Sequence, residues 1–514
     1  MLARITSAAV HGVEAVEVAI EGPVPQRLKE TVIVGRPDTA VKEAAERVQA
    51  ALRNSGFRYP ETHTTVNLAP ADLRKEGPGF DLPIALGVVA CTMIGSSPRF
   101  GGTIALGELA LDGAVRPVKG VLAVAIEARR LGCRRLIVPS ANATEAALVQ
   151  GLDVVPVESL RQAWEILVGA QEATVFHLDR AAFIESHSAY AADFTDVKGQ
   201  QTVKRALEVA VAGFHNVLMI GPPGTGKSML ASRLPTIMPQ LSEEEAIEVT
   251  KIHSIAGLLD PKLGFLATRP FRSPHHTISE AGLVGGSGNA GPGEVSLAHL
   301  GVLFLDELPE FKRGTLEVMR QPLEDGKVTI SRAAASLTFP ARFMLVAAMN
   351  PCPCGYYGDP KHECRCSPRQ IDQYRQRISG PLLDRIDLHV EVPQVAYRDL
   401  KGGPAGEPSA AIRARVERAR EVQQRRYDGL RVRVATRTNS SLPPKLLQQH
   451  CRIDAEGARF LEGAMMDFHL SARAHDRILK VARTLADLAG SEPIRPEHVL
   501  EAIQFRSLDR RLQW

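Results

Sequence analysis

The segment GPPGTGKS, residues 221–228, constrains the fold of this chain more than any other. It fits the phosphate-binding pattern G-x-x-x-x-G-K-[ST], it follows the apolar run NVLMI, and it precedes a helix-like run. The glycines let backbone N–H groups turn inward around phosphates, Lys227 neutralises the β and γ oxygens, and Ser228 can bind Mg²⁺. We therefore expect a P-loop α/β sheet that binds ATP and Mg²⁺. The predicted nucleotide-binding residues of the loop are Gly221, Pro222, Pro223, Gly224, Thr225, Gly226, Lys227 and Ser228.

A second motif supplies acidic groups for the same site. In GVLFLDELPEF, an apolar strand delivers Asp306 and Glu307 to its C-terminal end, where ligands bind in open α/β sheets. Asp306 is expected to hold Mg²⁺ mostly through its waters, and Glu307 to orient and deprotonate the attacking water. Asn350 ends the next apolar strand, where its amide can reach that water or the γ-phosphate, although asparagine is also common at strand ends.

Arg385, in ISGPLLDRIDLHVEV, has two interpretations. Within one subunit it can form an ordinary ion pair with Asp384 or Asp387. In a ring of subunits its guanidinium, which needs no change of protonation, can spread positive charge over the phosphates of a neighbour's ATP.

The composition limits where such a protein acts. Glu14 and Glu17 interrupt the N-terminus before any signal-peptide core, and no stretch reaches the roughly 18 uncharged apolar residues of a membrane span. We therefore expect a cytoplasmic protein with reduced thiols and no membrane partner. The net charge is only +4, so any contact with nucleic acid must come from local patches.

Four of the seven cysteines lie in NPCPCGYYGDPKHECRCSP, residues 350–368. Two Cys-x-Cys pairs in a reducing compartment can enclose one tetrahedral Zn²⁺, and His362 can replace one sulfur. The alternative is a reduced loop without metal. Zinc held by four protein ligands would be structural, because no position remains for a substrate. The predicted zinc ligands are Cys352, Cys354, Cys364 and Cys366.

The chain divides into four expected segments. The first alternates strand and helix patterns, the second has no clear period and reads as a linker, the third carries the P-loop, and the last is helical. The cysteine-rich stretch 350–368 would be an insertion in the third. The segments are residues 1–168, 169–193, 194–400 and 401–514.

Several of these motifs together resemble one family. RPFRSPHHTISEAGLVGG, PGEVSLAHLGVLFLDELPEF, AAMNPCPCG and LLDRIDLHVEV are similar to magnesium-chelatase-type AAA+ ATPases, and nearly the whole chain resembles the bacterial ComM/YifB group. The resemblance implies an AAA+ core, a parallel sheet with helices on both faces, followed by a helical lid. It also implies a hexameric DNA helicase with ATP at subunit interfaces, which drives branch migration in homologous recombination during natural transformation.

The resemblance also assigns roles to single residues. Asp306 and Glu307 match the family's Walker B acids, and Asn350 matches its sensor asparagine. Arg385 matches the arginine finger, and Arg473, in LSARAHDRILKVARTLADL, matches the second-sensor arginine. Single-stranded and branched DNA are the implied partners, and a recombinase is a further expected one.

The first 168 residues resemble the Lon protease catalytic domain, an α+β fold like that of ribosomal protein S5. The resembling pieces are LRKEGPGFDLPIALG and LGELALDGAVRPVKGVLAVAIEARRLGCRRLIVPSANA. Where the protease needs a serine this chain has Gly79, and where it needs a lysine it has Leu122, with Lys119 nearby. Without a nucleophile a Ser–Lys pair cannot act. A structural or DNA-binding role is expected instead.

The DNA contacts are expected in two places. A Gly- and Ser-rich insert before Asp306 is predicted to be a mobile loop in which Arg269 and Arg272 grip the phosphate backbone. Lys361 and Arg365 would form a charged edge on the cysteine-rich stretch. The neighbouring histidines 275 and 276 are not expected to bind metal, because adjacent side chains point different ways.

Two other functions remain open on sequence grounds. The ATPase core alone fits a magnesium-chelatase-type ATPase subunit, although porphyrin chelatase ATPase subunits lack the Lon-like domain. It also fits an AAA+ protein remodeller, because loops of this kind can pull either polymer.

Overall fold

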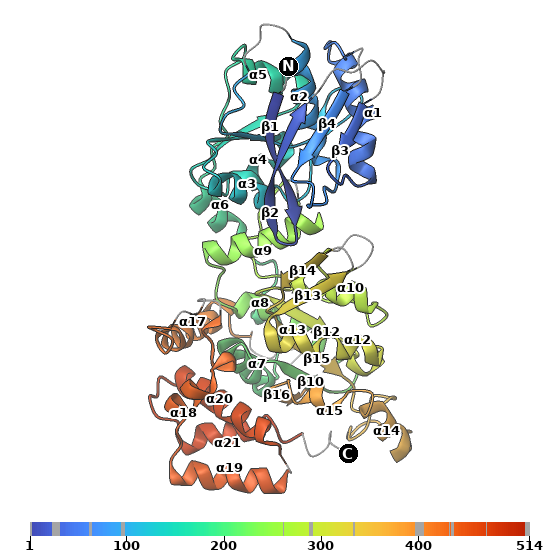
Figure 1. Ribbon diagram of the computed structural model, residues 1–514. Coiled ribbons are helices and arrows are strands. Elements are labelled where there is room, and N and C mark those ends of the chain that lie inside the picture. Colours follow the sequence, from blue (N-terminus) through green and yellow to red (C-terminus); the bar gives the residue numbers. More distant parts are fainter. Residues whose placement is uncertain are drawn as a thin grey trace. The chain divides into compact units, whose positions relative to one another are not determined.

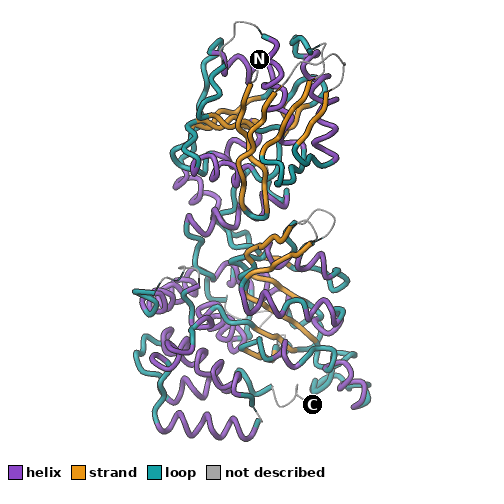
Figure 2. The backbone as a smooth tube through the Cα atoms, viewed as in Figure 1, coloured by secondary structure: helices purple, strands orange, loops and turns teal. Residues whose placement is uncertain are grey.

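The computed structural model describes residues 3–22, 31–60, 64–93, 98–260, 262–286, 291–332, 335–395, 406–430, 432, 436–468 and 470–508. The chain forms two compact units, which Figures 1 and 2 show by element and by secondary structure. The N-terminal unit comprises Met1–His187, Ala246–Ala267 and Ser331–Phe339, and the C-terminal unit comprises Ser188–Glu245, Thr268–Ile330 and Pro340–Trp514. Among the described helices, none has the length and apolar character needed to cross a membrane.

The N-terminal unit is built on a mixed seven-stranded sheet in the order β3-β4-β2-β1-β5-β8-β9. β1 and β2 form an antiparallel hairpin, whereas β1, β5, β8 and β9 run parallel. Alternate β1 and β2 residues, including Ile5, Val18 and Ile20, are buried under the apolar helix α2. The strands are β1 Ala3–His11, β2 Glu14–Gly22, β3 Thr31–Val34, β4 Thr64–Ala69, β5 Thr103–Ala105, β6 Glu108–Leu109, β7 Val115–Arg116, β8 Arg135–Pro139 and β9 Asp153–Val157.

Six helices of this unit lie in its first segment, and most of the helix α9 joins them from later in the chain. The amphipathic helix α1 begins after Asp38, whose carboxylate accepts from Val41 N, and it ends before Gly56, which has a positive φ. The helices are α1 Thr39–Asn54, α2 Asp81–Thr92, α3 Val121–Arg130, α4 Ala143–Ala146, α5 Leu160–Val168, α6 Arg180–His187 and α9 Glu243–Ala256.

The C-terminal unit contains a five-stranded parallel sheet in the order β11-β12-β15-β10-β16. The strands are short and almost fully buried, because helices cover both faces. The expected parallel sheet between two helical layers is confirmed. The strands are β10 Val217–Ile220, β11 Phe271–Arg272, β12 Val302–Leu305, β15 Met344–Met349 and β16 Leu388–Glu391, and a separate two-stranded sheet consists of β13 Lys327–Arg332 and β14 Ala335–Pro340.

The two faces of this sheet belong to separate hydrophobic cores. Val217, Met219 and Phe304 pack with α7, α8 and the C-terminal helices, whereas Leu218 and Leu303 pack with the helices α10 to α15. The helices are α7 Gln201–Gly213, α8 Lys227–Ile237, α10 Glu280–Val284, α11 Glu294–Leu297, α12 Arg313–Glu317, α13 Arg320–Asp325, α14 Pro368–Arg375, α15 Gly380–Leu383, α17 Ser409–Arg425, α18 Pro444–His450, α19 Ala455–Asp467, α20 Ala472–Leu488 and α21 Pro496–Gln504.

The boundaries between segments differ from the expected ones. The predicted linker 169–193 contains the helix α6, and the division between the two units falls after His187. Two stretches that were expected in the third segment, Ala246–Ala267 and Ser331–Phe339, belong to the N-terminal unit. The expected boundary between 194–400 and 401–514 lies outside the described residues.

Candidate nucleotide-binding site

The phosphate loop joins β10 to α8 in the way that the motif predicts. Gly224 and Gly226 have φ values of +76° and +84°, a conformation that residues with a Cβ atom rarely adopt. At Gly221 a Cβ atom would lie 2.3 Å from the carbonyl oxygen of Val392, which follows the neighbouring strand β16. All three glycines of the motif are therefore required by the backbone geometry of the loop.

Lys227, the first residue of α8, folds back over this loop. Its Nζ donates to the carbonyl oxygens of Gly221 at 2.7 Å and Pro222 at 2.9 Å, and to Oδ1 of Asn350 at 3.2 Å. Burial lowers the pKa of Lys227, and the nearby Asp306 partly opposes this shift. The structure thus brings Asn350 to the phosphate loop, because β15 and β10 are parallel neighbours whose carboxyl ends meet.

The two predicted magnesium-binding side chains contact each other. Ser228 Oγ donates to Oδ2 of Asp306 at 2.7 Å. Asp306 follows β12, which is separated from β10 by only one strand, β15, so the hydroxyl and the carboxylate meet at one edge of the sheet. An oxygen pair of this kind suits Mg²⁺.

Glu307 is held by a residue that has no predicted role. Its backbone has φ +52°, in the left-handed region, and its side chain is 55% exposed. Oε2 of the carboxylate lies 3.2 Å from Nδ1 of His276. His276 follows β11, the parallel neighbour of β12, and its ring lies 4.1 Å from that of His275. The sequence indicated only that the two histidines would not bind metal. Its pattern did not reveal the pairing of β11 with β12, which brings His276 to Glu307.

Arg385, the remaining predicted catalytic residue of the core, lies at the amino ends of the strands, opposite the phosphate loop. It precedes β16, and its side chain is 8% exposed. The guanidinium donates to Glu324 and to the carbonyl oxygen of Pro381. Neither expected partner, Asp384 or Asp387, forms this ion pair.

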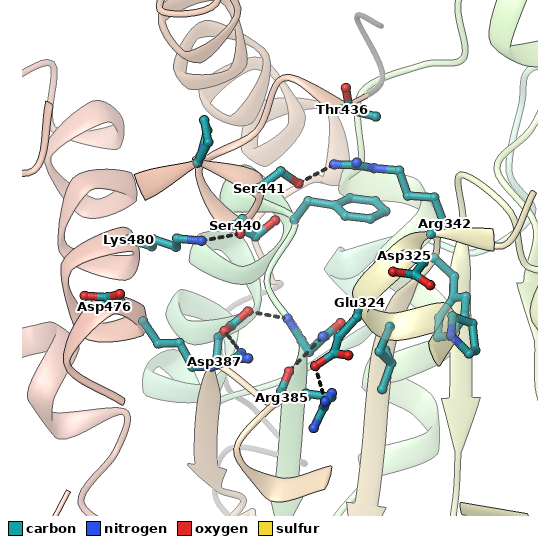
Figure 3. Close-up of a pocket in the computed structure, with 18 of the residues that line it drawn as sticks. Glu324, Asp325, Arg342, Arg385, Asp387, Thr436, Ser440, Ser441, Asp476 and Lys480 are labelled. Atoms are coloured by element: carbon teal, nitrogen blue, oxygen red, sulfur yellow. Dashed lines mark hydrogen bonds and ion pairs between the residues drawn. The ribbon is translucent and has the colours of Figure 1, made fainter. Parts of the chain in front are cut away.

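Arg385 lines a pocket of about 660 Å³, which is shown in Figure 3. Asn216, Phe343 and Asp387 line it too, and these residues immediately precede β10, β15 and β16. The pocket therefore lies at the amino ends of the strands, whereas the phosphate loop lies at their carboxyl ends. Five cationic side chains converge on it, namely Arg342, Arg385, Arg473, Arg477 and Lys480.

Arg473 and Arg477 come from α20, one turn apart. Arg473 is exposed at the start of the helix, as expected from the sequence. Arg477 donates to Asp387, which also accepts from the backbone N–H of Asn216 at 3.1 Å. Burial would raise the pKa of Asp387, but Arg477 and His215 outweigh it and hold the pKa well below its usual range.

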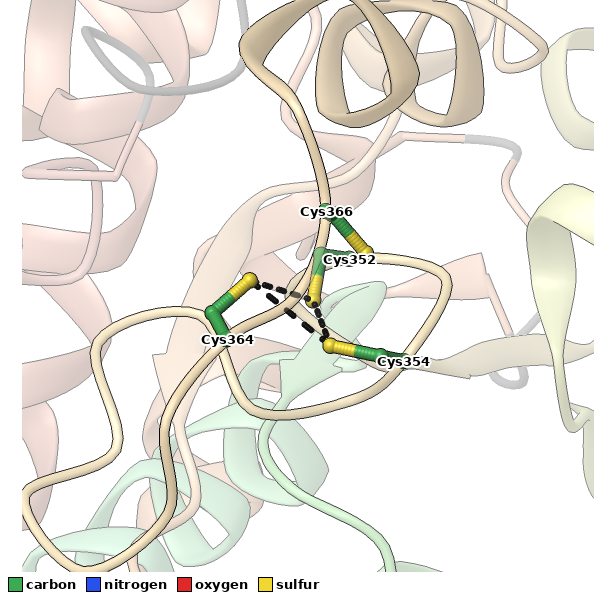
Figure 4. A group of neighbouring side chains, drawn as sticks. All are labelled: Cys352, Cys354, Cys364 and Cys366. Carbon is green, nitrogen blue, oxygen red and sulfur yellow. Dashed lines mark hydrogen bonds between the residues drawn. The ribbon is translucent and has the colours of Figure 1, made fainter.

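The four predicted zinc ligands converge on one point (Figure 4). The Sγ atom of Cys352 lies 3.4 Å from that of Cys354 and 3.7 Å from that of Cys364. A tetrahedron with Zn–S bonds of about 2.3 Å has edges of about 3.8 Å, so the donor set fits one Zn²⁺. Backbone N–H groups of Tyr356 and Arg365 donate to Cys354 and lower the pKa of its thiol to about 6.

His362 is not placed to replace a sulfur. Its Nδ1 lies 3.5 Å from Oδ1 of Asp359, and its ring lies 4.7 Å from the ring of Tyr356. The candidate metal cluster of the described residues consists of the four cysteines alone.

The prediction that Arg269 contacts DNA from a mobile loop is wrong, whereas the prediction for Arg272, whose side chain is 33% exposed, stays a prediction. Arg269 is buried, and its guanidinium donates to carbonyl oxygens, including that of Leu300 at 2.7 Å, and to Glu245 at 3.1 Å. Arg272 forms a bidentate pair with Glu294, at 2.6 and 2.7 Å. Both guanidinium groups thus stabilise the fold. The other two candidates, Lys361 and Arg365, are exposed.

In the N-terminal unit, the position expected to hold a serine in a protease offers no polar group. A Cβ atom on Gly79 would lie 3.9 Å from Cγ1 of Val118. Leu122 is buried, and its backbone N–H donates to the buried carboxylate of Glu145 at 2.8 Å. The resemblance of this unit to the Lon catalytic domain stays a prediction.

Comparisons with known proteins agree with the site. The family model described as magnesium chelatase, subunit ChlI, matches residues 193–400. Models of subunit ChlI of Mg-chelatase and of the ChlI C-terminal region match residues 16–142 and 406–506. Together with the parallel sheet and the phosphate loop, these matches indicate an ATPase of the magnesium-chelatase type.

Individual relatives narrow this assignment. The uncharacterized protein YifB of Escherichia coli K12 is 43% identical over 99% of this chain and 98% of its own length. The competence protein ComM of Haemophilus influenzae is 44% identical over 100% of this chain and 99% of its own length. The magnesium-chelatase 38 kDa subunit of Rhodobacter capsulatus is 26% identical over 40% of this chain. The chain belongs to the ComM/YifB family of magnesium-chelatase-like proteins.

Proposed function

We propose that the protein is an ATP-driven motor on DNA. It assembles into a hexameric ring, hydrolyses ATP at the subunit interfaces, and unwinds or branch-migrates DNA during recombination that accompanies natural transformation. The name of the Haemophilus relative, a competence protein, supports this role, and so does the 44% identity along the whole chain. Single-stranded and branched DNA are the proposed partners, and a recombinase is a further one.

The observation that carries the proposal is the separation of the cationic pocket from the phosphate loop. The pocket and the phosphate loop lie at opposite ends of β10. Its four residues span roughly 13 Å at about 3.3 Å per residue. Arg385 and Arg473 therefore face away from the ATP that their own Lys227 would bind. Arginines so placed can act on phosphates only when a second copy presents its loop to the pocket. A head-to-tail interface of this kind forms a ring when the rotation between neighbouring copies closes.

In the proposed mechanism each interface combines groups from two copies. Backbone N–H groups and Lys227 would hold the β and γ phosphates, and Ser228 and Asp306 would hold Mg²⁺. Glu307 would take a proton from the water that attacks the γ-phosphorus, while the bond from that phosphorus to the β–γ bridging oxygen breaks and ADP leaves. Arg385 from the next subunit then stabilises the charge that develops on the γ-phosphate.

Two further groups adjust the cationic pocket in this mechanism. Glu324 must release Arg385 before the guanidinium can bind a phosphate, so the ion pair keeps the arginine in place until a neighbour arrives. Arg477, which Asp387 orients, and Lys480 add positive charge that the sequence did not suggest.

Contact with DNA is proposed for the exposed side chains of the cysteine-rich stretch. Lys361 and Arg365 extend from the loop that the four thiols close, and a bound Zn²⁺ would keep this loop rigid. Contacts to phosphates make binding weaker at high salt and largely independent of base sequence.

The test uses a labelled four-way junction and a forked duplex. Wild type with ATP and Mg²⁺ is expected to convert both substrates, and Glu307→Gln is expected to bind ATP without converting either. ATP hydrolysis by wild type on DNA that stays paired would exclude the motor. Hydrolysis that responds to an unfolded protein instead of DNA would favour a protein remodeller.

A second candidate is an ATPase subunit for metal insertion into a porphyrin, which the match to the ChlI model favours. The likeness to the 38 kDa chelatase subunit covers only 40% of this chain, whereas the ComM and YifB relatives cover 99% or more. Stimulation of ATP hydrolysis by a porphyrin-binding partner, and not by DNA, would decide for this function.

A further inference from the structure

The cysteine-rich stretch lies directly against the phosphate loop. A Cβ atom on Gly355, between the first pair of cysteines and Tyr356, would lie 2.7 Å from Cδ and 3.2 Å from Cγ of Pro223. Real Cβ atoms do not approach other carbons this closely, so the backbone of Gly355 is in van der Waals contact with the Pro223 ring. Gly355 has φ +87°, so the turn that makes this contact needs a glycine for its backbone as well.

Pro223 can pass this contact on to the phosphate site. Its ring fixes φ, so the ring and the backbone move as one body. The next residue, Gly224, begins the part of the loop whose N–H groups are expected to turn toward phosphates. A displacement of the Pro223 ring therefore moves the groups that bind ATP.

The other side of Gly355 is fixed by the cysteines. Cys352 is fully buried, and the carbonyl oxygen of Cys352 accepts from the backbone N–H of Gly355 at 3.0 Å. Cys354 precedes Gly355, and its Sγ lies 3.6 Å from that of Cys364. A metal bound by the four thiolates would fix the turn from both of its ends and hold Gly355 in place. The same stretch starts at Asn350, whose amide oxygen accepts from Lys227.

We propose that the four-cysteine cluster positions the phosphate loop through the contact between Gly355 and Pro223. The metal-bound cluster holds the loop in the shape that binds ATP, so metal and ATP strengthen each other's binding. This inference rests on the ATP site of the proposed function, and it does not depend on DNA. Because coupling between two sites is reciprocal, ATP must also slow the loss of metal.

Two glycines of the same loop provide a matched pair of variants. Gly355 and Gly358 have φ values of +87° and +80°, but a Cβ atom on Gly358 would meet nothing within 4 Å. Alanine strains the backbone similarly at both positions, and only Gly355→Ala pushes on Pro223. Both variants are expected to keep zinc near one equivalent per chain, as measured by elemental analysis.

The measured quantity is the affinity for a fluorescent ATP analogue, with full-length protein. We expect binding to weaken roughly tenfold or more in Gly355→Ala and less than about twofold in Gly358→Ala, because small displacements of binding groups have large effects. Equal affinities in the two variants, with zinc retained, would overturn the proposal.

A second measurement tests the metal directly. Removal of zinc from wild type by a chelator is expected to weaken binding of the ATP analogue, and added ATP analogue is expected to slow zinc release to a chromogenic chelator. Zinc release at the same rate with and without nucleotide would also overturn the proposal. Lys227→Ala is the control for the site itself. If wild type and Lys227→Ala bind the analogue equally, the ATP site of the proposed function fails. If Lys227→Ala binds more weakly than wild type but Gly355→Ala binds as well as Gly358→Ala, the ATP site stands and only the present proposal fails.

Discussion

The carboxylate of Glu307, which follows β12, is contacted by His276 from the loop that follows the neighbouring strand β11. The left-handed backbone of Glu307 turns the carboxylate toward His276, which follows β11. A general base must keep its carboxylate within hydrogen-bond reach of the attacking water, so a partner that fixes its orientation affects the rate of the chemical step. We therefore expect His276 to act as a positioning residue in the proposed ATPase.

Replacement of His276 tests this role. We expect His276→Ala to lower kcat for ATP hydrolysis about tenfold with little change in KM, because the loss of orientation affects the transition state and not ATP binding. His276→Gln, which places an amide that can donate to the carboxylate of Glu307, should recover part of the rate. His275→Ala is the matched control, because Nδ1 of His275 hydrogen-bonds the hydroxyl of Thr277 at 2.9 Å rather than Glu307. The same loss of rate in both alanine variants would show that the loop, and not the contact of His276 with Glu307, matters.

At the scale of elements, one buried carboxylate joins a strand to the C-terminal helices. Asp387, just before β16, accepts from Arg477 of α20 and from the backbone N–H of Asn216, just before β10. His215 lies 3.3 Å from the same carboxylate and 2.8 Å from Thr484 of α20. Because these contacts fix α20 against the sheet, they also fix the two arginines that α20 brings to the cationic pocket.

We expect Asp387→Asn to lower the free energy of unfolding by about 2 kcal/mol near neutral pH, because it removes the charge that pairs with the half-buried Arg477 and lies 3.3 Å from the buried His215. The folded-state pKa of Asp387 is depressed, so its stabilising effect is complete above its unfolded pKa and is lost as the pH falls. The difference in the free energy of unfolding between wild type and variant should therefore become smaller below about pH 4. Denaturant titrations followed by fluorescence or circular dichroism at several pH values measure it. If this difference in the free energy of unfolding stayed constant as the pH fell, Asp387 would not be the ionised group that stabilises the fold.

The cysteine loop is the second element whose state can be measured. Purified native protein is expected to contain zinc near one equivalent, and Cys364→Ser combined with Cys366→Ser is expected to lose it, because two of four ligands are gone. Cys133→Ser, a thiol of the N-terminal unit, is the control and should keep the metal. Native protein without metal, purified in the absence of chelators, would contradict the zinc assignment.

Elements with strong local patterns could be predicted from the sequence, and features that depend on distant partners could not. The phosphate loop, the acidic strand end and the cysteine pairs each carry their chemistry within a short segment. Arg269 reads as a free cation, because its burial depends on carbonyl groups of Pro239 and Leu300, which only the fold brings near. Likewise the contact of His276 with Glu307 depends on the pairing of β11 with β12, and β11 is only two residues long.

At the scale of the whole molecule, one copy of the chain carries both halves of the proposed catalytic site but cannot join them. The phosphate loop lies at the carboxyl ends of the strands, and the pocket of Arg385 lies at their amino ends. Isolated subunits are therefore expected to hydrolyse ATP poorly, and activity should rise with protein concentration as rings form.

Mixing two inactive variants tests this arrangement directly. Lys227→Ala lacks a working phosphate loop but keeps Arg385, and Arg385→Ala has the opposite defect. In rings assembled from equal amounts of both, about one quarter of the interfaces join an intact loop from one variant to an intact pocket from the other. We expect the mixture to recover ATP hydrolysis toward that fraction of the wild-type rate, whereas each variant alone stays inactive. If Arg385 served the ATP of its own subunit, every site in the mixture would carry one defect and no activity would return, even though mixed rings form. Mass spectrometry of the intact assemblies confirms the mixing, so an inactive mixture that contains mixed rings would rule out a catalytic site shared between subunits.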